Sequence, residues 1–294
     1  MLPKTETDTS PDVMAFFDPA THTISYVVKD PNSPACAIID SVLDFDYAAG
    51  RTSHTSADRI IKFVKDHDLS VAWIIETHVH ADHLTAGAYL KERLGGKLAV
   101  SNQISKIQAT FADIFDEGSM FSRCGQQFDH LFIDDEVYAI GTMSAIAMAT
   151  PGHTPACMTH VIGDAAFVGD TLFMPDSGTA RVDFPGGDAR TLYRSIQRIF
   201  SLPEKTRLFM CHDYAPNGRQ IAWECSVEVE RAANIHVRSE ISENEFVKIR
   251  EARDATLAMP ALIIPSIQVN MRGGRFPEPH ANGQVFLKVP VNTL

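Results

Sequence analysis

The sequence predicts an α/β fold with two similar halves, each a sheet with helices on its outer face. Two observations support this. Short β-like runs and amphipathic helical segments follow one another, and the order strands, then helix–strand–helix, occurs twice. In addition, polar side chains follow several of the apolar runs, in loops past strand ends where rigid scaffolds place functional groups.

The first half begins with short β-like runs that turn residues separate, and continues with alternating helices and strands. We expect a helix from about Ser56 to Asp68 because its apolar residues recur on one side. Gly95 and Gly96 end the second helix. In chain order the elements are strands at 14–17, 24–28 and 37–39, helix 56–68, strand 71–76, helix 84–94, strand 97–100 and helix 103–115.

The second half repeats this order. The pair Gly163-Asp164 predicts a hairpin turn, and Ser242 with Glu245 forms a capping-box pattern that predicts a helix start. The expected elements are strands at 128–132, 137–140, 144–149, 158–162 and 165–169, helix 188–200, strand 207–211, helical stretches near 224–234 and from 242, and a tail from 259 with a β-like run at 284–289.

Composition and charge exclude several classes of function. The 294 residues carry a formal net charge of −11 without a run of Lys or Arg, which argues against binding to nucleic acid or an anionic membrane. The five cysteines are scattered and odd in number, which fits free thiols in a reducing compartment. Since we see no secretory signal and no apolar run of transmembrane length, we expect a cytoplasmic protein.

Residues 77–83 read Thr-His-Val-His-Ala-Asp-His and carry three histidines and one carboxylate directly after the apolar run 71–75. Imidazole and carboxylate groups are good ligands for divalent transition metals. Four polar groups crowded at a strand end would each need a partner if they were only structural. This cluster therefore predicts a metal site.

Three further candidate ligands follow predicted strands: His153, Asp170 and His212. Each one alone is explained by a structural role, since a lone histidine after a strand is often hydrogen-bonded and an Asp before a Thr often caps a turn. In the order His-x-His-x-Asp-His, His, Asp, His, they strengthen the metal prediction.

This series of motifs resembles the metallo-β-lactamase fold superfamily, which implies a four-layer αβ/βα sandwich. The matching segments are Thr77–His83, Thr150–Pro155, Gly169–Phe173 and Met210–Tyr214. The resemblance implies a lead-in at 1–12 and one metallo-β-lactamase-like domain at 13–294, with a helical and irregular C-terminal extension from about 224.

Within that superfamily the chain resembles the persulfide dioxygenase (sulfur dioxygenase) family, which is related to glyoxalase II. Three segments that carry no proposed iron ligand make this likeness more specific: Arg181-Val-Asp183-Phe184, the Asp-Tyr pair that follows His212, and Asn270-Met-Arg272-Gly-Gly. The longer helical C-terminal domain of glyoxalase II, with its own basic glutathione-binding residues, is not found.

The resemblance implies one Fe(II) per chain, held by His78, His153 and Asp170 in the two-His-one-carboxylate arrangement of non-haem Fe(II) oxygenases. The implied reaction oxidises glutathione persulfide with O₂ and water to sulfite and glutathione. His80, Asp82, His83 and His212 are then groups that orient the ligands and bound water.

The ligand types leave a second interpretation open. His78, His80, His153 and Asp170 are a complete set for one zinc ion. A second zinc ion would share Asp170 and use Asp82, His83 and His212. Such a dinuclear site activates a bridging hydroxide for attack on a thioester or lactone carbonyl.

Substrate contacts are predicted from the carboxylates of glutathione, which arginine binds through two parallel hydrogen bonds. The candidates are Arg181, Tyr214, Arg219 and Arg272, with Asp183 as support for Arg181. We interpret Cys157 and Cys211 as buried thiols because both lie within apolar runs. A homodimer is one expectation for the oligomeric state, which the sequence does not determine.

Overall fold

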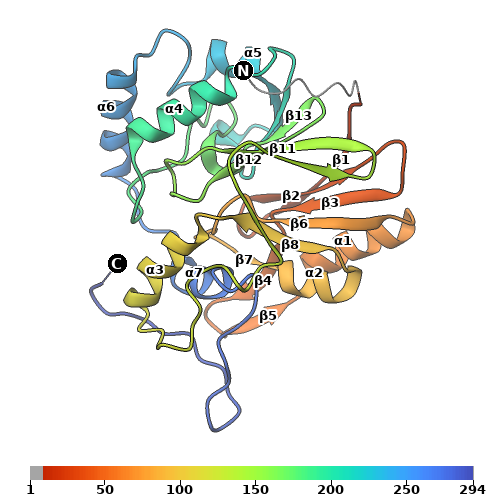
Figure 1. Ribbon diagram of the computed structural model, residues 1–294. Helices are drawn as coiled ribbons and strands as arrows, with labels where there is room; N and C mark the ends of the chain where they lie inside the picture. The colour runs from red at the N-terminus through yellow and green to blue at the C-terminus, as the bar shows by residue number, and fades with distance from the viewer. Residues whose placement is uncertain (1–8, 294) are drawn as a thin grey trace.

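The computed structural model describes residues 9–293, and its strands form two six-stranded sheets that face each other (Figure 1). In the first sheet the first three strands run antiparallel and the others pair in parallel. Its order is β1 (Asp12–Asp18), β2 (Thr23–Lys29), β3 (Ala35–Ile39), β6 (Ser70–Ile75), β8 (Lys97–Ser101) and β9 (His130–Phe132).

The second sheet is antiparallel apart from one parallel pair, β13 with β14. Its order is β10 (Glu136–Ile140), β11 (Met143–Ala149), β12 (Met158–Ile162), β13 (Ala165–Phe167), β14 (Arg207–Phe209) and β15 (Glu224–Ser226). A third, small sheet contains β5 (Arg51–Ser53), β4 (Val42–Asp46) and β7 (Leu84–Thr85).

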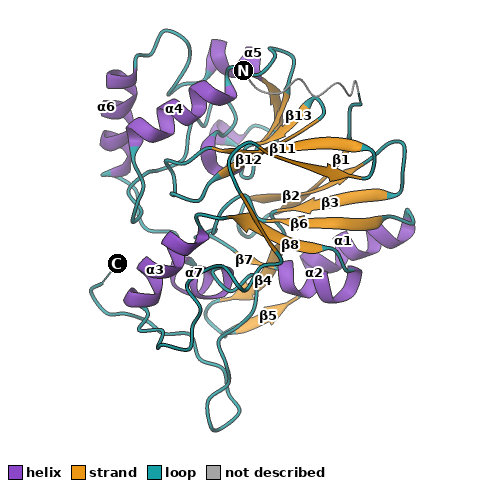
Figure 2. Cartoon of the chain, viewed as in Figure 1, coloured by secondary structure: helices purple, strands orange, loops and turns teal. Residues whose placement is uncertain are grey.

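Helices cover the outer face of each sheet, which gives the layers of Figure 2. The first sheet packs against α1 (Thr55–Asp66), α2 (Gly87–Leu94), α3 (Ile104–Ile114) and α7 (Ile263–Asn270). The second packs against α4 (Ala189–Ile199), α5 (Val227–Ala233) and α6 (Glu243–Asp254). A further apolar cluster fills the space between the sheets, so the predicted αβ/βα sandwich is confirmed.

Several elements differ from the sequence prediction. Strands β4 and β5 were not expected, and residues 284–289 form no strand. The tail instead contains α7, whose residues Ile263, Ile267 and Val269 are buried in the core of the first half. Pro265 is tolerated there because it lies in the first turn, where backbone N–H groups have no partner within the helix.

Residues 1–8 of the expected lead-in lie outside the described residues, whereas the Ser10 hydroxyl already donates to the Asp164 carboxylate. Beyond 224 the chain forms β15, α5, α6 and α7 and then continues without regular structure to 293. None of the helices in residues 9–293 is long and apolar enough to cross a membrane.

Candidate metal centre

The predicted ligands gather where strands of both sheets end. His78, His80 and His83 follow β6, and Asp170 lies in a short 3₁₀ turn (Gly169–Thr171) after β13. Gly169 has a φ of 53°, and a Cβ atom there would lie 2.6 Å from Thr77 Oγ1. Glycine at this position therefore lets the turn that carries Asp170 approach the histidine loop closely.

The first group of ligands, His78, His153 and Asp170, forms a triad. Their candidate ligand atoms all lie within 4.8 Å of one another. The Nε2 atoms of His78 and His153 lie 3.8 and 3.7 Å from Asp170 Oδ2. These separations are too long for hydrogen bonds and suit three atoms that surround one cation.

The other nitrogen of each triad histidine has a hydrogen-bond partner. His153 Nδ1 donates to the carbonyl oxygen of Arg181 at 2.7 Å, and His78 Nδ1 lies 3.1 Å from Thr77 Oγ1. Such contacts fix the tautomer and leave the Nε2 lone pair for a metal. Burial, together with the neighbouring histidines, holds the pKa of His78 well below its usual value, so the ring is neutral as a ligand must be.

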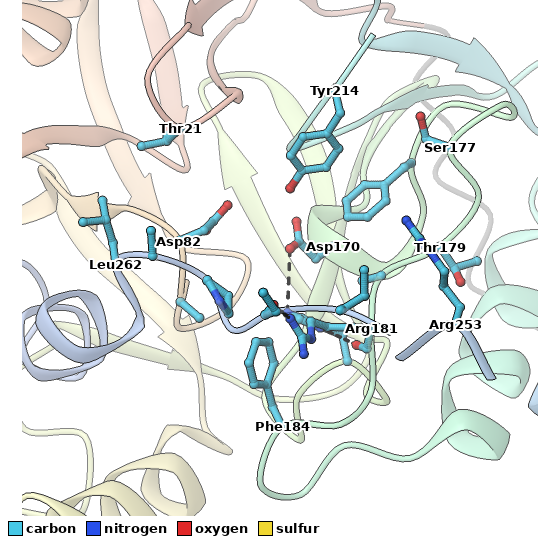
Figure 3. A pocket seen from close by; sticks show the side chains of 18 of the residues that line it. Thr21, Asp82, Asp170, Ser177, Thr179, Arg181, Phe184, Tyr214, Arg253 and Leu262 are labelled. Carbon is cyan, nitrogen blue, oxygen red and sulfur yellow. Dashed lines mark hydrogen bonds and ion pairs between the residues drawn. The ribbon is translucent and has the colours of Figure 1, made fainter. Parts of the chain in front are cut away.

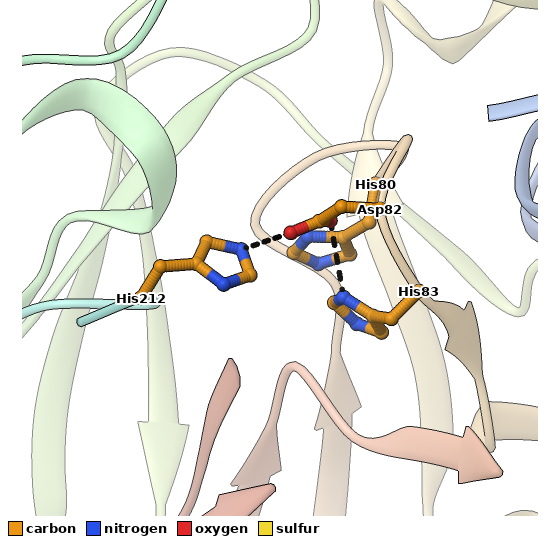
Figure 4. Close-up of side chains that lie close together, drawn as sticks. All are labelled: His80, Asp82, His83 and His212. Atoms are coloured by element: carbon orange, nitrogen blue, oxygen red, sulfur yellow. Dashed lines mark hydrogen bonds and ion pairs between the residues drawn. The ribbon is translucent and has the colours of Figure 1, made fainter. Parts of the chain in front are cut away.

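The second group contains His80, Asp82, His83 and His212, whose candidate ligand atoms all lie within 4.8 Å of one another (Figure 4). Asp170 joins this group to the first. Asp82 Oδ1 lies 3.3 Å from His83 Nδ1, and its Oδ2 lies 3.1 Å from His212 Nε2. Asp170 Oδ1 lies 3.3 Å from the same His212 nitrogen. Burial alone would raise the pKa of Asp82, but His212 and His83 hold it below its usual range.

Both groups fit metal ions on the chemistry of their donors. Several buried atoms lack a hydrogen-bond partner although polar atoms surround them, and a cation would complete them: His80 Nδ1, His83 Nε2, Asp170 Oδ1 and His212 Nε2. The seven predicted ligand residues therefore lie close together, as a site for one metal or for two requires.

Asp40 is a residue of this centre that the sequence reasoning missed. Its carboxylate accepts hydrogen bonds from the backbone and hydroxyl of Thr77 and lies 2.9 Å from His80 Nε2. Burial alone would lower the pKa of His80, but Asp40 raises it to about 9. The signal was available, since Asp40 directly follows the strand β3.

The C-terminal tail also supports the ligand loop. Asn270 donates from Nδ2 to the carbonyl oxygens of His80 and His83, and its Oδ1 accepts from the backbone N–H of Thr85. The Asn-Met-Arg-Gly-Gly motif of the sequence thus acts on the centre through its asparagine.

A cavity of about 510 Å³ opens beside the triad (Figure 3). His153 and Asp170 line it, as do Arg181 and Tyr214 among the predicted substrate contacts. The ring of Tyr214 is stacked on that of His212 at an interplanar angle of 15°. Asp183 binds the Arg181 guanidinium through both oxygens, at 2.6 and 2.7 Å, as expected for a supporting group.

The other two predicted substrate arginines lie elsewhere. Arg219 binds Asp176 and the fully buried Asp213, and Arg272 pairs with Glu117. Neither arginine lines the cavity, and both guanidinium groups are occupied by carboxylates. We therefore drop Arg219 and Arg272 as substrate contacts and assign them structural ion pairs.

Arg253, on α6, was missed by the sequence reasoning. Three arginines line the cavity, and Asp183 and Asp254 pair with Arg181 and Arg250. The exposed Arg253 guanidinium has no carboxylate partner among residues 9–293. The helical spacing of residues on α6 could have suggested Arg253, but nothing in the sequence indicated that this helix reaches the cavity.

The cysteines near the centre match the interpretation as buried thiols. Cys157 and Cys211 are 3% and 1% exposed. Burial raises the pKa of Cys157 to about 12, and it raises that of Cys211 well above the ordinary value. Neither thiol is ionised near neutral pH, so neither has the character of a nucleophile.

Comparisons with known proteins place this fold and centre in context. The family model "Metallo-beta-lactamase superfamily" matches residues 20–212. A probable metallo-hydrolase of Burkholderia pseudomallei is 53% identical over 96% of this chain and 99% of its own length. A beta-lactamase hydrolase-like protein of Xylella fastidiosa is 51% identical, and the chain spans only 66% of that relative.

Two other relatives bear on the chemistry. Glyoxylase B2 of Dictyostelium discoideum is 44% identical over 91% of this chain and 92% of its own length. The human mitochondrial persulfide dioxygenase ETHE1 is 32% identical over 88% and 87%. The crystal structure of ETHE1 from Myxococcus xanthus superimposes with a TM-score of 0.71 at 28% identity, over 90% of this chain and all of the other. The chain belongs to the metallo-beta-lactamase superfamily.

Proposed function

We propose that the protein is a persulfide dioxygenase with one Fe(II) held by His78, His153 and Asp170. It would convert glutathione persulfide, O₂ and one water into glutathione and sulfite. The outer sulfur loses four electrons, O₂ accepts them, and the S–S bond breaks so that the thiol leaves with a proton. When bound, the iron would supply the electron transfer to dioxygen.

The observation that carries this proposal is the position of the triad. Two of its three members line the cavity, whereas only Asp82 of the second group does so. The triad also supplies two nitrogens and one oxygen, the donor set of non-haem Fe(II) oxygenases. The likeness to persulfide dioxygenases over nearly their whole length supports the same reaction.

The chain's own residues would position the substrate. Aromatic and aliphatic side chains give the cavity apolar walls, among them Phe173, Phe184 and Leu257. We propose that the persulfide sulfur lies at the triad and that a carboxylate of the tripeptide reaches Arg253. The apolar walls would keep bulk water from the sulfur, and the ring of Tyr214 stacks on that of His212.

A dinuclear zinc hydrolase is the second candidate, and a specific observation favours it. His80 Nδ1, His83 Nε2 and Asp170 Oδ1 are buried without partners, as ligand atoms of a two-metal site would be. A probable metallo-hydrolase is also among the relatives. The reaction in that case is hydrolysis of a glutathione thioester or a lactone.

One experiment separates the two candidates. Protein purified without oxygen is analysed for metals, and oxygen uptake and sulfite are measured with glutathione persulfide in parallel with hydrolysis of S-lactoylglutathione. We expect about one iron per chain, with oxygen and sulfite in a one-to-one ratio. Two zinc ions per chain together with thioester hydrolysis and no oxygen uptake would replace this proposal by the hydrolase.

A further inference from the structure

The segment Gly178–Asp183 lies beside the metal centre and has no regular secondary structure, so its backbone needs partners from elsewhere. The region from α5 to α6 supplies several of them. Asn234 donates to the carbonyl oxygen of Gly178 at 3.0 Å, and His236 Nδ1 accepts from the N–H of Thr179 at 3.1 Å.

A buried ion pair on α6 holds the same segment at two more points. Arg250 and Asp254 are only 2% and 6% exposed and contact each other at 2.6 Å. Arg250 Nη1 donates to the Thr179 carbonyl oxygen at 2.7 Å. Asp254 Oδ2 accepts from the Val182 N–H at 2.9 Å. The pair thus holds the backbone on both sides of Arg181.

Arg181 connects this pair to the metal centre. Its carbonyl oxygen accepts the hydrogen bond from His153 Nδ1 at 2.7 Å. Its guanidinium donates to the Ala258 carbonyl oxygen just beyond α6, also at 2.7 Å. The direction of the Arg181 carbonyl, and with it the orientation of the His153 ring, depends on a segment that α6 holds on either side.

We propose that Arg250 and Asp254 are positioning residues of the metal centre, which orient His153 through the backbone of residues 179–182. A single planar guanidinium donates from Nε to Asp254 Oδ1 at 2.9 Å and from Nη1 to the Thr179 carbonyl oxygen, while its Nη2 lies 2.6 Å from the same carboxylate oxygen. The lysine ammonium group cannot reproduce this geometry. The inference requires a metal at His153, and it holds for either candidate reaction.

The decisive variant is Arg250→Lys, which keeps the charge beside Asp254 and loses the fork. The measurement is the affinity of metal-free protein for Fe(II) without oxygen, and for Zn²⁺, by competition with a chelator. We expect about tenfold weaker binding of both ions, as for other residues that orient ligands. With substrate, kcat is expected to fall while KM for the persulfide stays unchanged.

Glu243→Gln is the matched control. Glu243 also lies on α6, and it pairs with Arg190 and Arg194 of α4. Loss of the Glu243 charge loosens α6 at the end that does not contact residues 178–183. Metal affinity is expected to stay at the wild-type value in this variant.

A general loss of stability is tested by Ile196→Val, a change in the buried core beneath α4 and α6. Each of the three variants is assayed at the same interval below its own melting temperature. Nitrogen-15 spectra of metal-free protein follow the His153 Nδ1 proton, whose exchange with water is expected to accelerate only in Arg250→Lys.

Two results would overturn the inference: wild-type metal affinity in Arg250→Lys, or equal weakening in the control variants. The proposed reaction can fail separately. If the wild-type protein takes up no oxygen, the dioxygenase proposal falls, while the order of metal affinities still decides the role of Arg250 and Asp254.

Discussion

The two groups of metal ligands differ in what holds them. In the triad, the remote nitrogens of His78 and His153 contact a threonine hydroxyl and a backbone carbonyl, and two of the three residues line the cavity. In the second group, Asp82 bridges two histidines, and buried nitrogens stay without partners. Groups outside the centre therefore orient both triad histidines, whereas the second group combines one such partner, Asp40 at His80, with ion pairs from Asp82 to His83 and His212.

Similar ligand sets in one protein can thus be oriented for metal binding to different degrees. An oriented triad needs little rearrangement to bind a cation, and its outer contacts raise the basicity of its ligands. The second group must give up ion pairs to Asp82 before it binds a metal. One-metal and two-metal forms of this centre would thus differ mainly in whether Asp82 keeps its ion pairs with His83 and His212.

The largest expected effect comes from substituting one candidate ligand residue in each of the two groups. His153→Gln should lower oxygen-dependent persulfide turnover by about 1,000-fold or more, since it removes a proposed ligand of the iron. His83→Gln should lower it by only about 10- to 100-fold, as for residues around the ligands. The rates are measured with an oxygen electrode on iron-loaded protein.

His130→Gln is the control for these variants, because His130 pairs with Glu136 away from the centre. It should retain wild-type turnover. Equal losses in His153→Gln and His83→Gln would mean that the two groups act as one dinuclear site, and the distinction drawn above would be wrong.

An intermediate effect is expected at the far side of the cavity. Arg253→Gln should raise KM for glutathione persulfide about tenfold with little change in kcat, since a charge-assisted hydrogen bond to a carboxylate contributes about 1.5 kcal/mol or more. The matched control is Lys248→Gln, which removes a positive charge from the same helix outside the cavity lining. Initial rates over a range of persulfide concentrations give both constants.

The carboxylate itself can be removed to check the assignment. With a persulfide whose glycine carboxylate is esterified, wild type and Arg253→Gln should become alike if this group is the one bound. A tenfold difference that persists with both carboxylates blocked would show that Arg253 acts on something other than the substrate charge.

The smallest expected effect is on stability in acid. Burial, with help from Arg250 and Arg253, lowers the pKa of His236 to about 4, below its usual value of about 6.5. The unfolded chain therefore takes up this proton first, and stability is full above pH 6.5 and falls as the pH drops toward 4. Because His236 is only half-buried, the loss is about 1 kcal/mol after allowance for solvent screening.

Urea unfolding at several pH values measures this loss. His236→Asn keeps a hydrogen-bond acceptor and removes the titration, so its stability should vary less between pH 6.5 and 4 than that of the wild type. Identical slopes in the two proteins would assign the acid sensitivity to other groups.

The sequence predicted the parts of the molecule that depend on local patterns. The apolar runs predicted the main strands, and the order of His78 to His83 with His153, Asp170 and His212 predicted the candidate ligands, which the fold brings together. Metal ligands need particular residue types, so their identity is visible without a structure. The family resemblance then supplied the sandwich and the order of the triad.

What the sequence missed depends on long-range contacts. Helix α7 contains Pro265 and lies in a tail rich in Pro and Gly, so local rules described it as irregular, whereas burial of Ile263 and Ile267 in the core stabilises it. Asp40 and Arg253 are ordinary residues until the fold brings them to the centre and the cavity. Arg219 and Arg272 had the right chemistry and the wrong position.

Asn270 has a consequence for the order in which the protein is made. The loop that carries His80 and His83 is translated well before residue 270, yet among residues 9–293 the side-chain hydrogen bonds to its two carbonyl oxygens come from that residue. A chain emerging from the ribosome folds its N-terminal parts first and would hold these histidines in an unfinished loop until residue 270 has followed. The hydrogen bonds that complete this histidine loop therefore form only after the tail has docked.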